Sequence, residues 1–330
     1  MTPSPDHLVF GLYRAFLRQT RKLPHLYLQQ FWRIKAFDDV RAILKTDNGV
    51  RDTKFKRMAK DLRKLEAANN RDAKAFNHIL AVAYGRKGKL KRELMEPILT
   101  DPTAPIPPRI IPAVESSRPP VYSKELKALL ISGLSRTTKP LVAAQLEFPP
   151  TLPPRADPAS EEARLLGSFS KRRETNARWR YFVAEWQKVR PPLQVVVRSG
   201  PTDSPGVKLD DVRREGIRSL PMQGLHVFED VEKLASPPLP LAKRRTRNPR
   251  VKAPDPDTVP SRWLRRRYQE LLSRIPVLTY TAPPAKTPSY YSVSLSPSTQ
   301  LNIPHADTAD LEWMDENTTV VAKPKRAPNV

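Results

Sequence analysis

The sequence predicts a mainly α-helical protein: a small N-terminal helical bundle followed by a proline-rich, partly disordered tail with isolated basic helices. Apolar residues recur at helical spacing through Leu8–Tyr84, as in amphipathic helices that share a core. The 330 residues include 37 prolines but only 10 glycines, and the prolines are concentrated after residue 100. Proline interrupts helices and central strands, so we expect a compact bundle and a less regular remainder.

Composition shifts divide the chain into four parts. We assign residues 1–98 to the bundle and residues 99–159 to a proline-rich linker with one short helix. Residues 160–276 are expected to be a partly ordered, basic helical region. Residues 277–330 are expected to be a largely disordered tail that contains an acidic–aromatic segment, 307–316.

The first helix is predicted over Leu8–Lys22 and has two different faces. Its apolar positions follow the i, i+4, i+7, i+8 pattern of a core-facing stripe: Leu8, Leu12, Ala15 and Phe16. Its basic positions follow an i, i+4, i+7 pattern on another face: Arg14, Arg18 and Arg21. A helix of this kind favours a core on one side and an acidic partner on the other.

Further helices complete the predicted bundle. They are expected at His25–Thr46, from Asp52 or Thr53 to Asn69, at Arg71–Tyr84, and from Lys87 to just before Pro97. In the tail we expect a short helix at Ser123–Leu134, one long helix at Ser160–Val189 and a basic helix at Ser261–Arg274. Leu193–Arg198 reads as a single strand without an obvious pairing partner.

The charge favours polyanionic partners. Lys and Arg total 58 against 34 Asp and Glu, a formal net charge of +24, which suits nucleic acid, an anionic membrane or an acidic protein. A solvated basic surface without a partner is the simpler interpretation. The chain lacks cysteine, which excludes disulfides and cysteine chemistry. The five histidines are scattered, so a metal site is not expected.

The N-terminal region also has the character of a mitochondrial import signal. Asp6 is the only acidic residue in 1–37, a stretch that is rich in arginine and amphipathic. No apolar run approaches the roughly 20 residues that a bilayer requires. We expect import into the mitochondrion.

The segment LYRAFLRQTRK, followed by a second basic–aromatic helix, resembles the LYR-motif (complex 1 LYR) family over residues 6–95. Within it, the chain is most similar to long fungal mitochondrial members with a C-terminal extension. The resemblance implies a three-helix adaptor in the mitochondrial matrix that binds acylated acyl carrier protein and performs no chemistry. It also implies a role in the assembly or stability of a respiratory complex, iron–sulfur machinery or the mitoribosome.

The resemblance and the helical stripes together give candidate site residues. Contacts with the carrier protein are expected from the motif and neighbouring cations: Leu12, Tyr13, Arg14, Arg18, Lys22, Lys35 and Arg41. An acyl-chain channel is expected between the helices, lined by Phe16, Phe37, Val40 and Leu44. The protein would hold no cofactor of its own, because the acyl-phosphopantetheine group belongs to the partner.

The alternative function is a mitoribosome-associated RNA-binding protein that acts through its basic tail. Its contacts with nucleic acid, or with a client protein, would come from two basic–aromatic helices: Arg178, Trp179, Arg262, Trp263, Arg265, Arg266 and Arg267. Enzymatic activity is not expected, because the sequence has no glycine-rich phosphate loop, nucleophile elbow or paired His/acid constellation.

Overall fold

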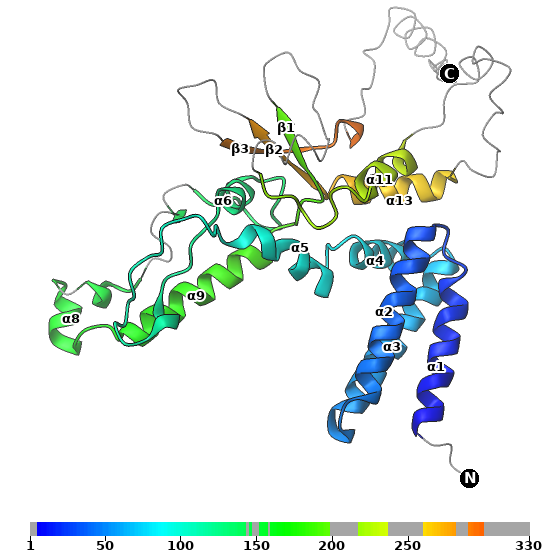
Figure 1. The fold of residues 1–330 in the computed structure, drawn as a ribbon, viewed down its shortest axis with the longest axis horizontal. Helices are drawn as coiled ribbons and strands as arrows, with labels where there is room; N and C mark the ends of the chain where they lie inside the picture. The colour runs from blue at the N-terminus through cyan, green and yellow to red at the C-terminus, as the bar shows by residue number, and fades with distance from the viewer. Residues whose placement is uncertain are drawn as a thin grey trace, which may run out of the picture. The chain divides into compact units, whose positions relative to one another are not determined.

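Helices dominate the part of the chain that the computed structural model describes. That part comprises residues 5–142, 145–146, 152–157, 159–198, 217–236, 260–281 and 290–299. All of these residues belong to one unit, Met1–Thr299. The predicted mainly α fold with an N-terminal helical bundle is confirmed (Figure 1).

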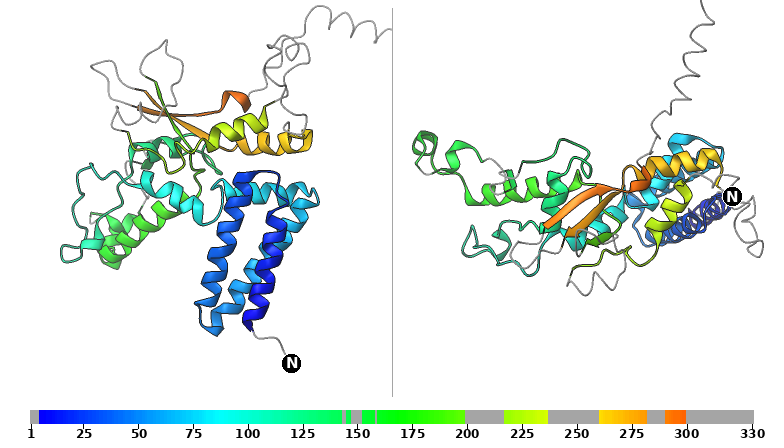
Figure 2. Two further views of the ribbon diagram at one scale, coloured as in Figure 1. Left: turned by 45° about the vertical axis from the view of Figure 1, so that its right-hand side comes forward. Right: turned by 90° about the horizontal axis from the view of Figure 1, so that it is seen from above.

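Three helices form the body of the bundle: α1 (Pro5–Thr20), α2 (Leu26–Leu44) and α3 (Asn48–Asn69). They pack side by side, as Figures 1 and 2 show. The buried face of α2 follows helical spacing and consists of Leu28, Trp32, Ala36, Val40 and Ile43. The amphipathic pattern therefore decides which side of each helix faces the core, because burial of the apolar stripe removes it from water.

Helix α3 begins earlier than predicted. We expected Asp47-Asn48-Gly49 to form a turn, with the helix starting at Asp52 or Thr53. Instead Asp47 has an extended conformation and its carbonyl oxygen accepts hydrogen bonds from the amides of Val50 and Arg51, at 3.2 Å each. Asp47 is thus the N-cap, a position that aspartate favours.

Two shorter helices follow, α4 (Ala73–Ala83) and α5 (Lys89–Leu99). The Asp72 side chain caps α4 by accepting a hydrogen bond from the Lys74 amide at 2.8 Å. Helix α5 continues through Pro97, where we expected it to stop. Its last turn is held by Arg218, whose guanidinium donates to the carbonyl oxygens of Pro97 (2.7 Å) and Thr100 (2.6 Å).

Where the structure describes it, the middle of the chain includes the helices α6 (Lys124–Ile131), α8 (Glu161–Leu166) and α9 (Lys171–Gln187). Short 3₁₀ turns lie at Glu115–Ser117 and Pro154–Ala156. The single long helix predicted over Ser160–Val189 is wrong, because α8 ends at Gly167. That glycine has φ +79°, a left-handed conformation incompatible with a continuing helix.

A three-stranded sheet also forms, with the order β1-β2-β3. Strand β1 (Val195–Arg198) pairs in parallel with β2 (Pro276–Thr281), which pairs antiparallel with β3 (Tyr290–Leu295). A last 3₁₀ turn follows at Pro297–Thr299. The predicted lone strand thus has a partner. All of β3 and all of β2 except Pro276 fall within residues 277–330, so our expectation of a largely disordered tail is corrected for these strands.

Helices α11 (Val227–Ala235) and α13 (Arg262–Leu272) pack against each other, and α13 also packs on α4 (Figure 1). Tyr268 of α13 is completely buried in the same apolar cluster as Phe16, Trp32 and Leu65 of the bundle. The basic helix that we expected to be isolated therefore belongs to the main core. The basic run 243–250 and the acidic–aromatic segment 307–316 lie outside the described residues.

Candidate functional site

Helix α1 and the turn after it present a row of cations to solvent. Arg14, Arg18, Arg21 and Lys22 are all exposed, and the three arginines have the predicted i, i+4, i+7 spacing. Within the described part of the chain, none of the four forms an ion pair with a carboxylate. Their charges are consequently available to an acidic partner.

Apolar side chains are exposed on the neighbouring helix α2. Ile34, Phe37 and Leu44 are 62%, 54% and 40% exposed, and Arg41 on the same helix is exposed too. These positions have i, i+3, i+7, i+10 spacing and so lie along one side of α2. Exposed apolar groups gathered along one element are characteristic of interaction surfaces. We call Arg14, Arg18, Ile34, Phe37 and Leu44 the α1–α2 face.

Lys35 does not belong with these exposed cations. Its ammonium group forms ion pairs with Asp39 at 2.6 Å and with Asp61 of α3 at 2.8 Å, and lies 5.4 Å from the centre of the Trp32 ring. Burial opposes the charged form, but Asp61 and Asp39 outweigh it and raise the pKa of Lys35. The geometry thus gives Lys35 a role inside the bundle, in place of the expected partner contact.

The residues expected to line an acyl-chain channel are divided between the core and the surface. Phe16 and Val40 are buried, and the Phe16 ring lies 6.1 Å from that of Trp32 in a closed core. Phe37 and Leu44 are exposed. The four side chains therefore do not line one common space. Leu12 and Tyr13 of the motif are half-buried and pack against the core.

The residues predicted to contact nucleic acid also do not form one surface. On α9, Arg178 forms an ion pair with Glu174 at 2.8 Å, and the indole nitrogen of Trp179 donates a hydrogen bond to the Arg118 carbonyl oxygen at 3.0 Å. On α13, Arg262 and Arg266 are exposed, whereas Arg265 is half-buried.

Two further members of that set have structural contacts on α13. Trp263 packs against Phe76 of α4, with ring centroids 4.9 Å apart. Arg267 forms an ion pair with Glu270 at 3.0 Å. A tryptophan held in the core is not free to stack on a base, so the matched basic–aromatic pattern of α9 and α13 does not produce two equivalent surfaces.

Helical spacing did not identify three exposed apolar residues of α1 and α2: Leu8, Phe10 and Ile34. Leu8 is 51% exposed and Phe10 is 45% exposed. The signal for Ile34 was present, because it falls outside the apolar stripe of Trp32, Ala36 and Val40. A large apolar residue on the polar side of an amphipathic helix is the feature that identifies such a surface.

Neither a metal centre nor a membrane span is found where the structure is described. No group of three or more histidine, aspartate or glutamate side chains there is arranged to hold a metal ion. Among the same residues, no helix combines the length and the apolar character needed to cross a bilayer.

Part of the chain is similar to a known protein family. Residues 12–95 match the family described as LYR motif-containing protein 2-like. Comparisons with curated proteins and with solved structures found no significant match. The matched range begins at Leu12 of the motif and ends in α5, so it includes the motif and the helices that follow it. The similarity of this chain to LYR motif-containing proteins is thus found over residues 12–95.

Proposed function

We propose that this protein is a non-enzymatic adaptor or assembly factor of the mitochondrial matrix that binds acylated acyl carrier protein through the α1–α2 face. LYR-motif proteins are generally mitochondrial adaptors and typically bind acyl carrier protein. The client would be a respiratory complex, the iron–sulfur machinery or the mitoribosome. Two observations carry the proposal: the exposed cationic row of α1 and the exposed apolar residues along α2. The two helices pack against each other and lie mostly within the matched range.

The chemistry of the partner suits this surface. An acyl carrier protein is acidic, and its phosphopantetheine arm carries a phosphate and an acyl chain. Arg14 and Arg18, which have no carboxylate partner among the described residues, can form charge-assisted hydrogen bonds with carboxylates or with that phosphate. Exposed Lys22 and Arg41 extend the same charge.

The acyl chain has two possible resting places. Phe37 and Leu44 are accessible on the surface, whereas Phe16 and Val40 can be reached only if α1 and α2 separate. Burial of the chain contributes about 0.8 kcal/mol per methylene. We propose that the chain first contacts Phe37 and Leu44 and enters between the helices only when its burial offsets the cost of opening them.

The test is binding of purified acylated and unacylated carrier protein to the full chain and to matched variants. Arg14→Glu should weaken binding at least tenfold, because each lost charge-assisted hydrogen bond is worth about 1.5–3 kcal/mol. Arg57→Glu is the control, since Arg57 is an exposed arginine on α3. Both variants should keep the far-UV circular dichroism of the parent protein.

A second pair of matched variants tests how much the acyl chain contributes to binding. Phe37→Ser should reduce the preference for the acylated carrier over the unacylated one. Leu165→Ser, at an 84% exposed position on α8, should not change it. If neither carrier form binds, or if Arg14→Glu and Arg57→Glu weaken binding equally, the proposed face is wrong. Retention of RNA alone, lost as salt rises, would favour the RNA-binding alternative.

A further inference from the structure

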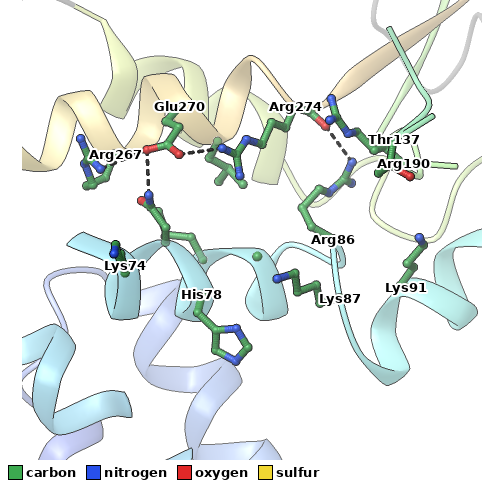
Figure 3. Close-up of a pocket in the computed structure, with 14 residues that line it drawn as sticks. Lys74, His78, Arg86, Lys87, Lys91, Thr137, Arg190, Arg267, Glu270 and Arg274 are labelled. Atoms are coloured by element: carbon green, nitrogen blue, oxygen red, sulfur yellow. Dashed lines mark hydrogen bonds and ion pairs between the residues drawn. The ribbon is translucent and has the colours of Figure 1, made fainter. Parts of the chain in front are cut away.

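A basic pocket lies away from the α1–α2 face, where α4 and the start of α5 meet α13. Its volume is about 380 Å³, and Figure 3 shows cationic side chains that surround it. Four of them come from residues 74–91, Lys74, Arg86, Lys87 and Lys91, and Arg190 comes from a distant part of the chain. The pocket is thus a product of tertiary structure.

The charges around the pocket do not balance. Glu270 is the one carboxylate in its lining, and it is already engaged by Arg267 at 3.0 Å and by Arg274 at 2.8 Å. Its Oε2 atom also accepts a hydrogen bond from Asn77 at 2.7 Å. The five cations named above have no ion pair with a carboxylate in the described residues, so the pocket carries a large excess of positive charge.

Arg86 shows the imbalance most clearly. Its Nε atom donates a hydrogen bond to the Tyr84 carbonyl oxygen at 3.1 Å. Its Nη1 atom donates to the Arg274 carbonyl oxygen at 3.4 Å (Figure 3). Its Nη2 atom is buried without a hydrogen-bond partner. Burial, together with the charge of Arg190, lowers the pKa of Arg86 to about 9. A buried guanidinium with a free donor is poised for an anion.

Lys91 is affected in the same way. Its ammonium group donates to the Gln187 carbonyl oxygen at 2.5 Å, and burial with the charges of Arg86 and Arg190 lowers the pKa of Lys91. Two guanidinium groups and an ammonium group held this close repel one another unless an anion lies between them. The fold maintains this arrangement because the backbone carbonyls fix Arg86 and Lys91 in place.

The size and the walls of the pocket indicate the class of anion. Leu80, Ala81 and Leu271 supply apolar lining, and the volume falls in the range of small-molecule sites, roughly 300–1,000 Å³. Guanidinium groups match phosphate oxygens by forked hydrogen bonds. We propose that this pocket binds a compact polyphosphate, a chain of two or three phosphate groups, supplied either as inorganic polyphosphate or as a nucleoside di- or triphosphate.

The test is calorimetric titration of the full chain with sodium tripolyphosphate, with ATP and with inorganic phosphate at constant ionic strength. Saturable one-to-one binding of tripolyphosphate or ATP is expected. The variant Lys74→Gln/Lys87→Gln removes two exposed lysines of the pocket and should weaken that binding at least tenfold. The control Lys56→Gln/Lys127→Gln removes two exposed lysines from α3 and α6 and should leave it within about twofold.

The relative affinities distinguish the two sources. Tighter binding of ATP than of tripolyphosphate would identify the ligand as a nucleotide. Tighter binding of tripolyphosphate would identify it as an inorganic polyphosphate. Equal loss in both double variants would overturn the proposal, because it would reflect net charge alone. Binding of a single-stranded RNA that tripolyphosphate does not displace would also overturn it. Carrier-protein binding should be unchanged in Lys74→Gln/Lys87→Gln, which separates this site from the α1–α2 face.

Discussion

Trp263 of α13 packs against Phe76 of α4, with ring centroids 4.9 Å apart, and so joins the C-terminal part of the chain to the N-terminal bundle. Asn77, which follows Phe76 in α4, donates a hydrogen bond to Glu270 of α13 at 2.7 Å. Tyr268 of α13 is completely buried, and its ring lies 6.4 Å from that of Tyr84, centroid to centroid. A bundle of short helices alone is marginally stable, and α13 adds apolar burial to it.

Trp263→Ala should therefore destabilise the whole fold and not only the extension. Replacement of a core tryptophan by alanine typically costs about 3–5 kcal/mol, and the half-buried Trp263 should fall near the lower end of that range. Chemical denaturation monitored by far-UV circular dichroism measures the loss. Trp179→Ala, at a 39% exposed position on α9, is the matched control and should cost about 1 kcal/mol. Equal, small losses would show that α13 does not stabilise the bundle.

The sequence was sufficient to predict the helices of the bundle but not the elements that pack against them. Helical spacing predicted the bundle because its signal is local, and Ser160 acts as the predicted cap, accepting a hydrogen bond from the Ala163 amide at 3.2 Å. The pairing of β1 with β2 depends on strands that are distant in the sequence, so no local pattern reveals it. The same limit applies to the packing of α13 on α4.

The candidate site divides in the same way. The exposed row of Arg14 and Arg18 follows from spacing alone, because a polar stripe opposite an apolar one faces water. The role of Lys35 could not be predicted, since Asp61 lies on another helix and is brought to 2.8 Å only by packing. The basic pocket depends entirely on such packing, with Arg86 and Arg190 contributed by distant segments.

Lys35→Met should lower stability without weakening carrier-protein binding. It leaves Asp39 and Asp61 without their common cation, and loss of one member of a partly buried ion pair costs roughly 1–3 kcal/mol. Lys22→Met should have the opposite profile, with weaker carrier binding and unchanged stability, because Lys22 is exposed. Denaturation curves and carrier titrations on both variants test this crossed pair. Loss of carrier binding in Lys35→Met at unchanged stability would restore Lys35 to the interaction surface.

Gly85→Ala should destabilise the connection between α4 and α5. Gly85 has φ +68°, and a Cβ atom there would collide with the Leu94 side chain. A strained left-handed residue costs about 1–3 kcal/mol, and the collision adds to that cost. Gly11→Ala on α1 is the control, since no atom lies within 4 Å of the added Cβ and the exchange should stabilise a helix by roughly 0.5–1 kcal/mol. Thermal denaturation should give a lower melting temperature for Gly85→Ala and a higher one for Gly11→Ala than for the parent protein.

Buried tyrosines should make the fold sensitive to alkaline pH. Burial raises the pKa values of Tyr27, Tyr84, Tyr122 and Tyr268 above their ordinary value of about 10. Above about pH 10 the unfolded chain releases these phenol protons while the folded chain retains them. The folded state then binds more protons than the unfolded state, so the free energy of unfolding falls as pH rises, by about 1.4 kcal/mol per tyrosine for each pH unit.

Urea denaturation at about pH 8, 10 and 11 measures this loss, and tyrosinate absorbance in the same samples reports ionisation. The stability contributed by the protonated phenols is fully present below about pH 10 and is lost above it. Tyr268→Phe removes one such group and should make the decline shallower. The contradicting result would be a smooth rise in tyrosinate absorbance while the far-UV signal and the free energy of unfolding stay constant. The phenols would then lose their protons in the folded state. The core around Tyr268 would be more open to solvent than its complete burial indicates.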